Sequence, residues 1–245
     1  MNTHAPLAII AGFSSTIGRA MTQQLLDRGW TVLGFSRRPV DLHHDNLLQI
    51  AIDFTDEASI EMAAGFARDA IASRKQTPDL ILETAGILHS EDVKPEKALR
   101  DMNMDAFLKV FQINTFGPAL IMKHFLPLLP RQKKAVFAAL SARVGSISDN
   151  QLGGWYAYRA SKAALNMLIR NAAIETGRRN KNAVIVGLHP GTVDSPLSKP
   201  FQGAVPEGKL FTADYSADRL LSVLETLTPQ DSGELFAWDG ERISP

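Results

Sequence analysis

The first residues suited to chemistry form a glycine-rich turn, AGFSSTIG (residues 11–18), directly after a strand-like run. Gly12 permits a tight turn and a close backbone approach, and Ser14 and Ser15 offer hydroxyl groups. A helix beginning near Ile17 would present free N–H groups and the positive end of its dipole to an anion. The pattern predicts a pyrophosphate-binding turn, and an ordinary strand–helix turn with a serine N-cap is the alternative.

Two arginines follow the second strand-like run, in Ser36-Arg37-Arg38. In dinucleotide-binding folds an acid at this place binds the ribose 2′-OH of NAD, whereas an arginine accommodates the 2′-phosphate of NADP. The sequence has no acid there, which favours NADP(H), and a solvated basic loop is the alternative. After the third run, Asp53 and Phe54 are placed to meet the adenine, although Asp53 would serve equally near the N-cap of the next helix.

A second group of polar residues lies in the middle of the chain. Tyr158 and Lys162 are four residues apart, and therefore one turn apart on one face of a predicted helix. This spacing alone is weak evidence, because it arises by chance in many helices. Ser141 follows a buried strand-like run, and Asn114 lies inside a helical pattern. Because asparagine is unfavourable in a helix interior, we expect the side chain of Asn114 to have a function.

The elements that position these residues alternate along the chain. Strands are predicted at Leu7–Ala11, Thr31–Phe35, Leu47–Ile52, Asp79–Leu82, Ala135–Leu140, Ala183–Leu188 and Glu234–Trp238. Helical patterns lie between them, at Ile17–Leu25, Ile60–Ile71, Asp101–Leu129, Tyr156–Gly177 and Ala217–Leu227. This alternation predicts an α/β fold of the Rossmann type, with a doubly wound, mostly parallel seven-stranded sheet and helices on both faces. Ligands of such sheets bind at the carboxyl ends of the strands.

Composition excludes several classes of function. The 245 residues suit one domain, residues 1–245, and 26 basic residues balance 26 acidic ones, which argues against a nucleic acid partner. The absence of cysteine excludes disulfides, thiolate nucleophiles and iron–sulfur clusters. His43 and His44 lie in a polar loop, and we expect no metal site. With no signal-peptide pattern and no run of about 18 apolar residues, we expect a cytoplasmic protein with no membrane partner.

Several motifs occur in an informative order: the glycine turn, Ala85-Gly86 after the fourth strand, and then Asn114, Ser141, Tyr158 and Lys162. In this order they resemble the short-chain dehydrogenase/reductase family, and the resemblance covers essentially the whole chain. The stretch SARVGSISDNQLGGWYAYRASKAALN is similar to the subfamily that contains the C-factor cell-signalling proteins and the Sniffer carbonyl reductases. In that subfamily the loop between the serine and the tyrosine is long, as it is here.

The resemblance implies four catalytic roles. Tyr158 is the general acid that gives its proton to a carbonyl oxygen, and Lys162 lowers the pKa of that phenol and holds the nicotinamide ribose. Ser141 hydrogen-bonds the substrate oxygen. Asn114 anchors a water that leads protons from Lys162 to solvent.

The resemblance also implies where the cofactor lies. Pro190, Gly191 and Val193 seat the nicotinamide ring, and Ser195 lies near its carboxamide, where threonine is usual. The expected NADP(H)-binding residues are Gly12, Ser14, Ser15, Thr16, Ile17, Gly18, Ser36, Arg37, Arg38, Asp53, Phe54, Ala85, Gly86, Tyr158, Lys162, Pro190, Gly191, Val193 and Ser195.

Two positions depart from the family pattern. Thr16 stands where a glycine is usual, which leaves the local geometry of the turn open. Glu83-Thr84 replaces the usual pair of asparagines before Ala85-Gly86. The missing asparagine normally ties the central strands together, so Glu83 must find another partner or face water.

The leading hypothesis is an NADP(H)-dependent reductase of small to medium aldehydes and ketones. The alternatives are a non-catalytic NADP(H)-binding regulator or signalling protein, and an enzyme of another short-chain chemistry such as epimerisation. Arg143 would favour an anionic substrate if it pointed into the pocket, and a surface or subunit ion pair is the other interpretation. We further expect a lid at about residues 195–212, with no long helix, and a homodimer or homotetramer.

Overall fold

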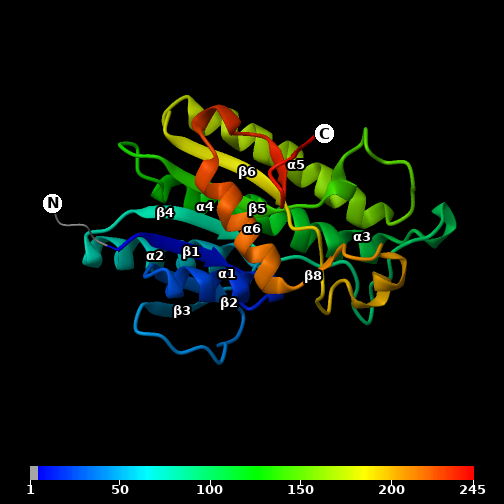
Figure 1. Ribbon diagram of the computed structural model, residues 1–245, viewed down its shortest axis with the longest axis horizontal. Coiled ribbons are helices and arrows are strands. Elements are labelled where there is room, and N and C mark those ends of the chain that lie inside the picture. The colour runs from blue at the N-terminus through cyan, green and yellow to red at the C-terminus, as the bar shows by residue number, and fades with distance from the viewer. Residues whose placement is uncertain (1–4) are drawn as a thin grey trace.

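A computed structural model describes residues 5–245 and has a twisted sheet at its centre (Figure 1). The strands of this sheet lie in the order β10-β9-β6-β5-β4-β1-β2-β3, and all neighbours are parallel except β9 and β10. The bounds are β1 Leu7–Ala11, β2 Thr31–Ser36, β3 Leu47–Ala51, β4 Pro78–Glu83, β5 Ala135–Leu140, β6 Ala183–His189, β9 Leu235–Ala237 and β10 Arg242–Ile243. The Rossmann-type doubly wound architecture is confirmed.

The strand count is larger than the seven predicted. The seven predicted strands form the parallel part of the sheet, and β10 adds an antiparallel edge through the pair Arg242–Phe236. A separate parallel pair consists of β7 (Thr192–Val193) and β8 (Leu210–Phe211). These additional strands have two residues each, which is too short for an alternating pattern to be visible in the sequence.

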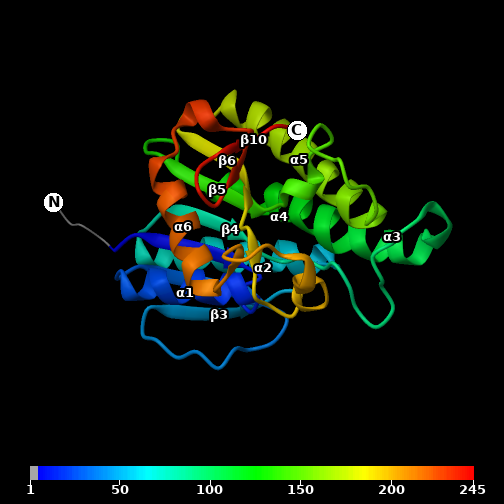
Figure 2. The same ribbon diagram turned by 45° about the vertical axis from the view of Figure 1, so that its right-hand side comes forward.

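Helices cover both faces of the sheet (Figure 2). One face packs against α1 (Thr16–Asp27) and α6 (Ala213–Thr226), and the other packs against α2 (Glu57–Arg74), α4 (Gly117–Phe125) and α5 (Tyr156–Gly177). Alternate residues of each strand serve the two cores: in β1, Ile9 lies in one core and Ile10 in the other. Since every residue of β1 is buried, the strand is a continuous apolar run, as expected for a parallel sheet covered on both faces.

The helical pattern predicted over Asp101–Leu129 is not one regular helix. It begins as α3 (Met104–Phe111), widens into a π-helical turn at Gln112–Phe116 and continues as α4. A short 3₁₀ turn at Leu126–Leu128 ends it. Such π turns are uncommon and often mark functional sites, and this one contains Asn114.

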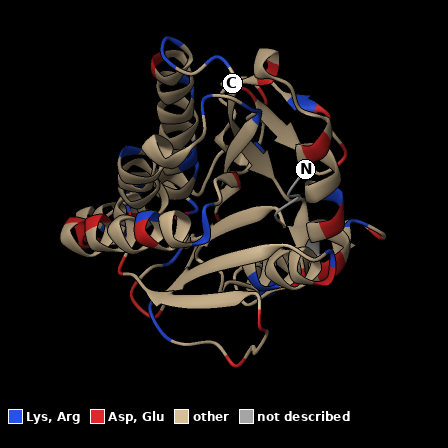
Figure 3. Ribbon diagram, turned by 90° about the vertical axis from the view of Figure 1, so that its left-hand side faces the viewer, with Lys and Arg blue, Asp and Glu red and all other residues tan. Residues whose placement is uncertain are grey.

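The surface carries both signs of charge, and basic and acidic positions are mixed along the helices on both sides of the sheet (Figure 3). Some apolar side chains on the helices that contain or adjoin Asn114 and Tyr158 are exposed and not in the core, among them Met104, Leu108 and Met167. The predicted homo-oligomer stays a prediction. Within residues 5–245, no helix is both long enough and apolar enough to cross a membrane.

Candidate active site

Several of the predicted functional residues lie at or just after the carboxyl ends of neighbouring strands. The glycine turn follows β1, Glu83 ends β4, Ser141 follows β5, and Pro190 follows β6. These strands are adjacent in the order β6-β5-β4-β1, and their following segments lie toward the right-hand side of Figure 1. The fold thus brings together residues that are far apart in the sequence.

The glycine turn has the shape needed to present a helix N-terminus. Gly12 has a φ of 85°, which favours glycine, and the Ser15 hydroxyl caps α1 by accepting a hydrogen bond from Gly18 N at 3.0 Å. Among residues 5–245, no group accepts a hydrogen bond from the backbone N–H of Thr16 or Ile17. Both donors are therefore available to an anion. Thr16, in place of the usual glycine, is the first residue of α1.

Thr84 fastens this turn to the end of β4. Its hydroxyl oxygen lies 2.9 Å from Gly12 O and 3.1 Å from Ala11 O, and it accepts a hydrogen bond from Ser15 Oγ at 3.2 Å. A Cβ added at Gly18 would lie only 2.6 Å from Thr84 Oγ1, so this glycine is required for close packing. The departure from the family pattern at Thr84 thus has a local structural role.

The side chains of Arg37 and Arg38 are exposed just beyond β2. Within the described part of the chain, neither forms an ion pair, while the Ser36 hydroxyl donates to Arg38 O at 2.5 Å. Asp53 accepts hydrogen bonds from the amide and hydroxyl of Thr55, and these bonds are the main cause of its lowered pKa. The N-cap of α2 is Asp56, so Asp53 is not that cap.

Asn114 ties the π-helical turn to the loop after β4. Its Oδ1 accepts from Ile87 N at 2.8 Å, and its Nδ2 donates to Ile87 O at 2.8 Å and to Ser161 Oγ at 3.2 Å. Asn114 and Ser161 are fully buried. A Cβ added at Gly86 would lie 3.6 Å from Asn114 Oδ1 and 3.8 Å from Lys162 Nζ. Gly86 therefore leaves a small space that borders both polar groups.

Lys162 and Glu83 are charged residues buried beneath this space, with exposed fractions of 3% and 0%. Lys162 Nζ donates to Leu140 O at 2.8 Å, and Glu83 Oε1 accepts from Ala85 N at 2.8 Å, while Glu83 Oε2 is buried without a partner. Burial raises the pKa of Glu83 to about 8, against the attraction of Lys162. Burial also lowers the pKa of Lys162 to about 8, against the attraction of Glu83. Glu83 therefore faces the protein interior and not water.

Tyr158 lies half-buried near the start of α5, beside Trp155. Its pKa is raised by burial to about 12, whereas the sequence-based expectation was a pKa lowered by Lys162. That expectation is wrong for this structure. Desolvation of the phenolate is the dominant effect, and the Lys162 ammonium is directed to Leu140 O and interacts with Glu83.

Ser141 is buried at the end of β5 and donates a hydrogen bond to Asn166 Oδ1 at 2.6 Å. Asn166 lies one helical turn after Lys162 on α5, and its Nδ2 is buried without a partner. Sequence reasoning did not single out Asn166. The signal was available, because the spacing of four from Lys162 puts both residues on the same helix face.

The segment after β6 turns back over the site. Gly191 adopts a φ of 76°, and a Cβ there would lie 2.5 Å from the Phe211 ring. Beyond Val193, residues 195–212 contain a 3₁₀ turn (Lys199–Ala204) and β8, in agreement with the prediction that no long helix forms there. The Phe201 ring in this segment packs edge-on against Trp155, with centroids 5.0 Å apart.

Arg143 and His189 lie near the end of β5 and at the end of β6. Arg143 pairs with Glu241 at 2.5 Å and with Asp149 at 3.4 Å, so its guanidinium serves ion pairs within the chain. His189 ends β6 and its Nδ1 is buried without a partner. Burial, followed by the positive charge of Arg143, lowers the pKa of His189 to about 4.

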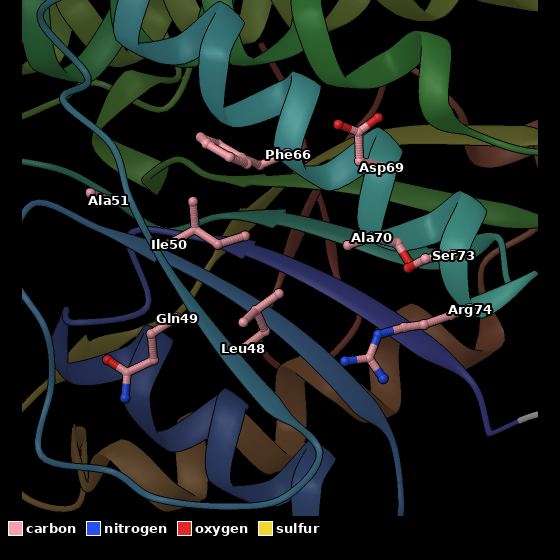
Figure 4. A pocket seen from close by; sticks show the side chains of 9 residues that line it. All are labelled: Leu48, Gln49, Ile50, Ala51, Phe66, Asp69, Ala70, Ser73 and Arg74. Carbon is pink, nitrogen blue, oxygen red and sulfur yellow. The ribbon is translucent and has the colours of Figure 1, made fainter.

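A hollow lies elsewhere on the molecule. It measures about 640 Å³ and lies between the edge strand β3 and α2, where Phe66, Asp69 and Arg74 surround it (Figure 4). None of the predicted site residues lines it. The candidate active site is therefore defined by its side chains and not by this hollow.

The family model described as short chain dehydrogenase matches residues 6–204. C-signal from Myxococcus xanthus is 35% identical over 146 residues, which cover 60% of this chain and 82% of that protein. An NADPH-bound carbonyl reductase from chicken fatty liver is 26% identical, with a TM-score of 0.82, and the match covers 99% of this chain and 100% of that one. The carbonyl reductase Sniffer of D. melanogaster is 20% identical, with a TM-score of 0.84 over 99% and 100% of the two chains, and shows the shared fold.

Proposed function

Because the chain belongs to the short-chain dehydrogenase family, we propose that it is an NADPH-dependent reductase of neutral aldehydes and ketones, with Tyr158 as the general acid. The observation that carries the proposal is that Asn114 Oδ1 and Lys162 Nζ both lie beside Gly86, after β4, and that Lys162 Nζ also donates to Leu140 O, next to Ser141. Tyr158 lies one turn before Lys162 on α5, and the glycine turn follows the neighbouring strand β1. The NADPH-bound carbonyl reductase that this chain resembles supports the cofactor and the reaction.

The residues present fit the cofactor. The free N–H groups of Thr16 and Ile17 would bind the pyrophosphate, and Arg37 and Arg38 would bind the 2′-phosphate. The buried, unpartnered Nδ1 of His189 lies beside Pro190-Gly191, where the nicotinamide would be seated. When bound, NADPH supplies the hydride that reduces the carbonyl carbon.

Tyr158 gives its phenolic proton to the carbonyl oxygen, so that the phenol O–H bond breaks and the alcohol O–H bond forms. The raised pKa keeps the phenol protonated throughout the neutral range, which is the form an acid needs. The phenolate left behind then takes a proton from the Lys162 ammonium one helical turn away, so that an N–H bond of Lys162 breaks and the phenol O–H bond forms again. Asn114 Oδ1 and Lys162 Nζ border the space at Gly86, through which a proton returns to Lys162.

The surroundings favour a neutral substrate. The Trp155 ring packs edge-on beside Tyr158, with ring centroids 6.3 Å apart, and Arg143 is engaged by Glu241 and Asp149. We propose that residues 195–212 act as the lid over this substrate. Support comes from the contact of Phe201 with Trp155, and from the bond between His89 Nε2 and Pro196 O at 3.0 Å.

The test measures oxidation of NADPH and of NADH by the purified protein with a panel of aldehydes and ketones, including an aromatic aldehyde and its carboxylated analogue. We expect reduction of the neutral compounds and tighter binding of NADPH than of NADH. Arg37→Asp should remove this cofactor preference, because an Arg–phosphate contact contributes about 1.5–3 kcal/mol, roughly tenfold to a hundredfold in affinity. NADPH binding without turnover of any compound would favour the non-catalytic alternative.

A further inference from the structure

The hydrogen bond between Ser141 and Asn166 conflicts with the proposed use of Ser141. A hydroxyl group has one hydrogen and two lone pairs, and the Ser141 hydrogen is directed to Asn166 Oδ1 at 2.6 Å. Oδ1 carries no hydrogen, so in this orientation of the amide the Ser141 hydroxyl is the donor. In this arrangement Ser141 offers a substrate only lone pairs, whereas a carbonyl oxygen that becomes an alkoxide needs hydrogen-bond donors.

The amide nitrogen of Asn166 can remove this conflict. Its Nδ2 is a double donor that is buried without a partner. The χ2 torsion of asparagine is broad and roughly two-fold, so a half-turn exchanges Oδ1 and Nδ2 within nearly the same volume. After that half-turn Nδ2 donates to Ser141 Oγ, and the Ser141 hydrogen is released.

Nothing on the far side of the amide opposes this half-turn. Within residues 5–245, Nδ2 has no hydrogen-bond partner, so no bond is broken there when the two atoms exchange. The hydrogen bond with Ser141 is therefore the one that the amide orientation changes. With no acceptor nearby, Ser141 donates to Asn166; with a carbonyl oxygen nearby, Ser141 donates to that oxygen and accepts from Asn166.

We propose that Asn166 is a positioning residue for carbonyl reduction, which donates through Nδ2 to Ser141 and thereby makes Ser141 a donor to the substrate oxygen. This inference rests on the proposed function. It is distinct from a packing role, because it depends on the hydrogen that Asn166 supplies and not on the volume of its side chain.

Two substitutions separate these roles. Asn166→Asp keeps the shape, but its carboxylate only accepts and so retains the Ser141 hydrogen. Asn166→Leu keeps the volume and removes both polar functions. The Ser141 hydroxyl is then free to donate to a substrate, but it no longer accepts a hydrogen bond from residue 166. Met167→Leu is the matched control, because Met167 is the next residue on α5 and is 61% exposed.

The experiment measures kcat and KM at about pH 9.5, because burial raises the pKa of a carboxyl group in this region, as it does for Glu83, and the carboxyl of Asn166→Asp must be ionised. NADPH is saturating, and the substrate is the carbonyl compound that the wild type reduces fastest. We expect kcat to fall about 30-fold or more in Asn166→Asp, about three- to tenfold in Asn166→Leu, and not at all in the control. NADPH affinity should change little in both variants, and the melting temperature should fall in Asn166→Asp, because its carboxylate is buried. In a Ser141→Ala background both Asn166 substitutions should have no effect on kcat, because their effect passes through Ser141.

A larger loss in Asn166→Leu than in Asn166→Asp would overturn the inference. Equal losses from the Asn166 substitutions in the wild type and in the Ser141→Ala background would also overturn it. Either result leaves the proposed reductase activity standing. A wild-type protein that reduces no carbonyl compound would overturn the proposed function and this inference together, so the two failures are distinguishable.

Discussion

The glycine turn and the catalytic centre lie at the same sheet edge but differ in how far their polar side-chain atoms are hydrogen-bonded. In the turn, the Ser15 and Thr84 hydroxyls bond each other, and the backbone of residues 11–18 satisfies them. In the centre, Glu83 Oε2, Asn166 Nδ2 and His189 Nδ1 are buried and have no hydrogen-bond partner among residues 5–245. The turn satisfies its hydroxyls and leaves the backbone N–H groups of Thr16 and Ile17 free for an anion, whereas the centre keeps buried side-chain atoms without partners among residues 5–245.

This difference has an energetic meaning. Each buried polar atom without a partner costs about 1–3 kcal/mol, so three of them in one region represent a substantial local loss of stability. Such losses are typical of functional sites, where groups are held for a reaction and not for the fold. We therefore expect substitutions in the turn to change cofactor affinity, and substitutions in the centre to change turnover or pH behaviour.

The largest effect in the turn is expected from Gly18→Ala. The added Cβ would lie 2.6 Å from Thr84 Oγ1 and 2.7 Å from Gly12 O, so the turn must shift. Because the shift withdraws N–H groups that would bind the pyrophosphate, and a hydrogen bond to a charged group contributes about 1.5–3 kcal/mol, NADPH affinity should fall roughly tenfold to a hundredfold in a fluorescence titration. Gly65→Ala on α2 is the control, since its added Cβ meets nothing within 4 Å. Unchanged NADPH affinity in Gly18→Ala would contradict the predicted role of the turn.

A smaller effect of the same kind is expected from Thr84→Val, which keeps the shape and removes the hydroxyl that binds Ser15 and Gly12. We expect a loss of about 1–3 kcal/mol in the free energy of unfolding and roughly tenfold weaker NADPH binding. Turnover at saturating NADPH should stay close to wild type. A lowered kcat with normal NADPH affinity would place Thr84 in the catalytic centre. It would contradict the expectation that substitutions in the turn change cofactor affinity and not turnover.

The smallest effect concerns stability in acid and arises in the centre. His189 has a pKa of about 4 in the folded protein and about 6.5 when unfolded. Its contribution to stability is therefore complete above pH 6.5 and is lost as the pH falls toward 4. Between pH 7.5 and pH 5 this loss is about 2 kcal/mol, and His189→Asn should remove it.

Urea unfolding at the two pH values measures this loss. His43→Asn is the control, because the side chain of His43 is 90% exposed. The same pH dependence in wild type and His189→Asn would show that the buried imidazole is not its source.

The sequence was sufficient to predict the parallel sheet, because each buried strand is a continuous apolar run between turn residues. It also predicted the residues gathered at the sheet edge, because carboxyl ends of parallel strands share that edge. The π-helical turn at residues 112–116 was not predicted, since its apolar pattern continues that of the adjoining helices.

The pKa values and hydrogen-bond partners of the buried side chains could not be predicted from the sequence either. The pKa of Tyr158 depends on the balance between burial and the distance to Lys162, which the spacing of four residues does not determine. The role of Thr84 depends on contacts across more than 60 residues of chain. The bond from Ser141 to Asn166 depends on which way a buried amide points, which composition and periodicity do not reveal.

The central claim is that Tyr158 supplies the proton for reduction, and stopped-flow measurement of NADPH oxidation by Tyr158→Phe tests it most directly. The substitution keeps the ring and removes only the hydroxyl, so NADPH affinity should stay within about twofold of wild type while the reduction rate falls by roughly 10²–10⁴. Tyr215 lies on α6 and is 44% exposed, so Tyr215→Phe should keep both the NADPH affinity and the reduction rate of the wild type. A near-normal rate of reduction in Tyr158→Phe would contradict the account.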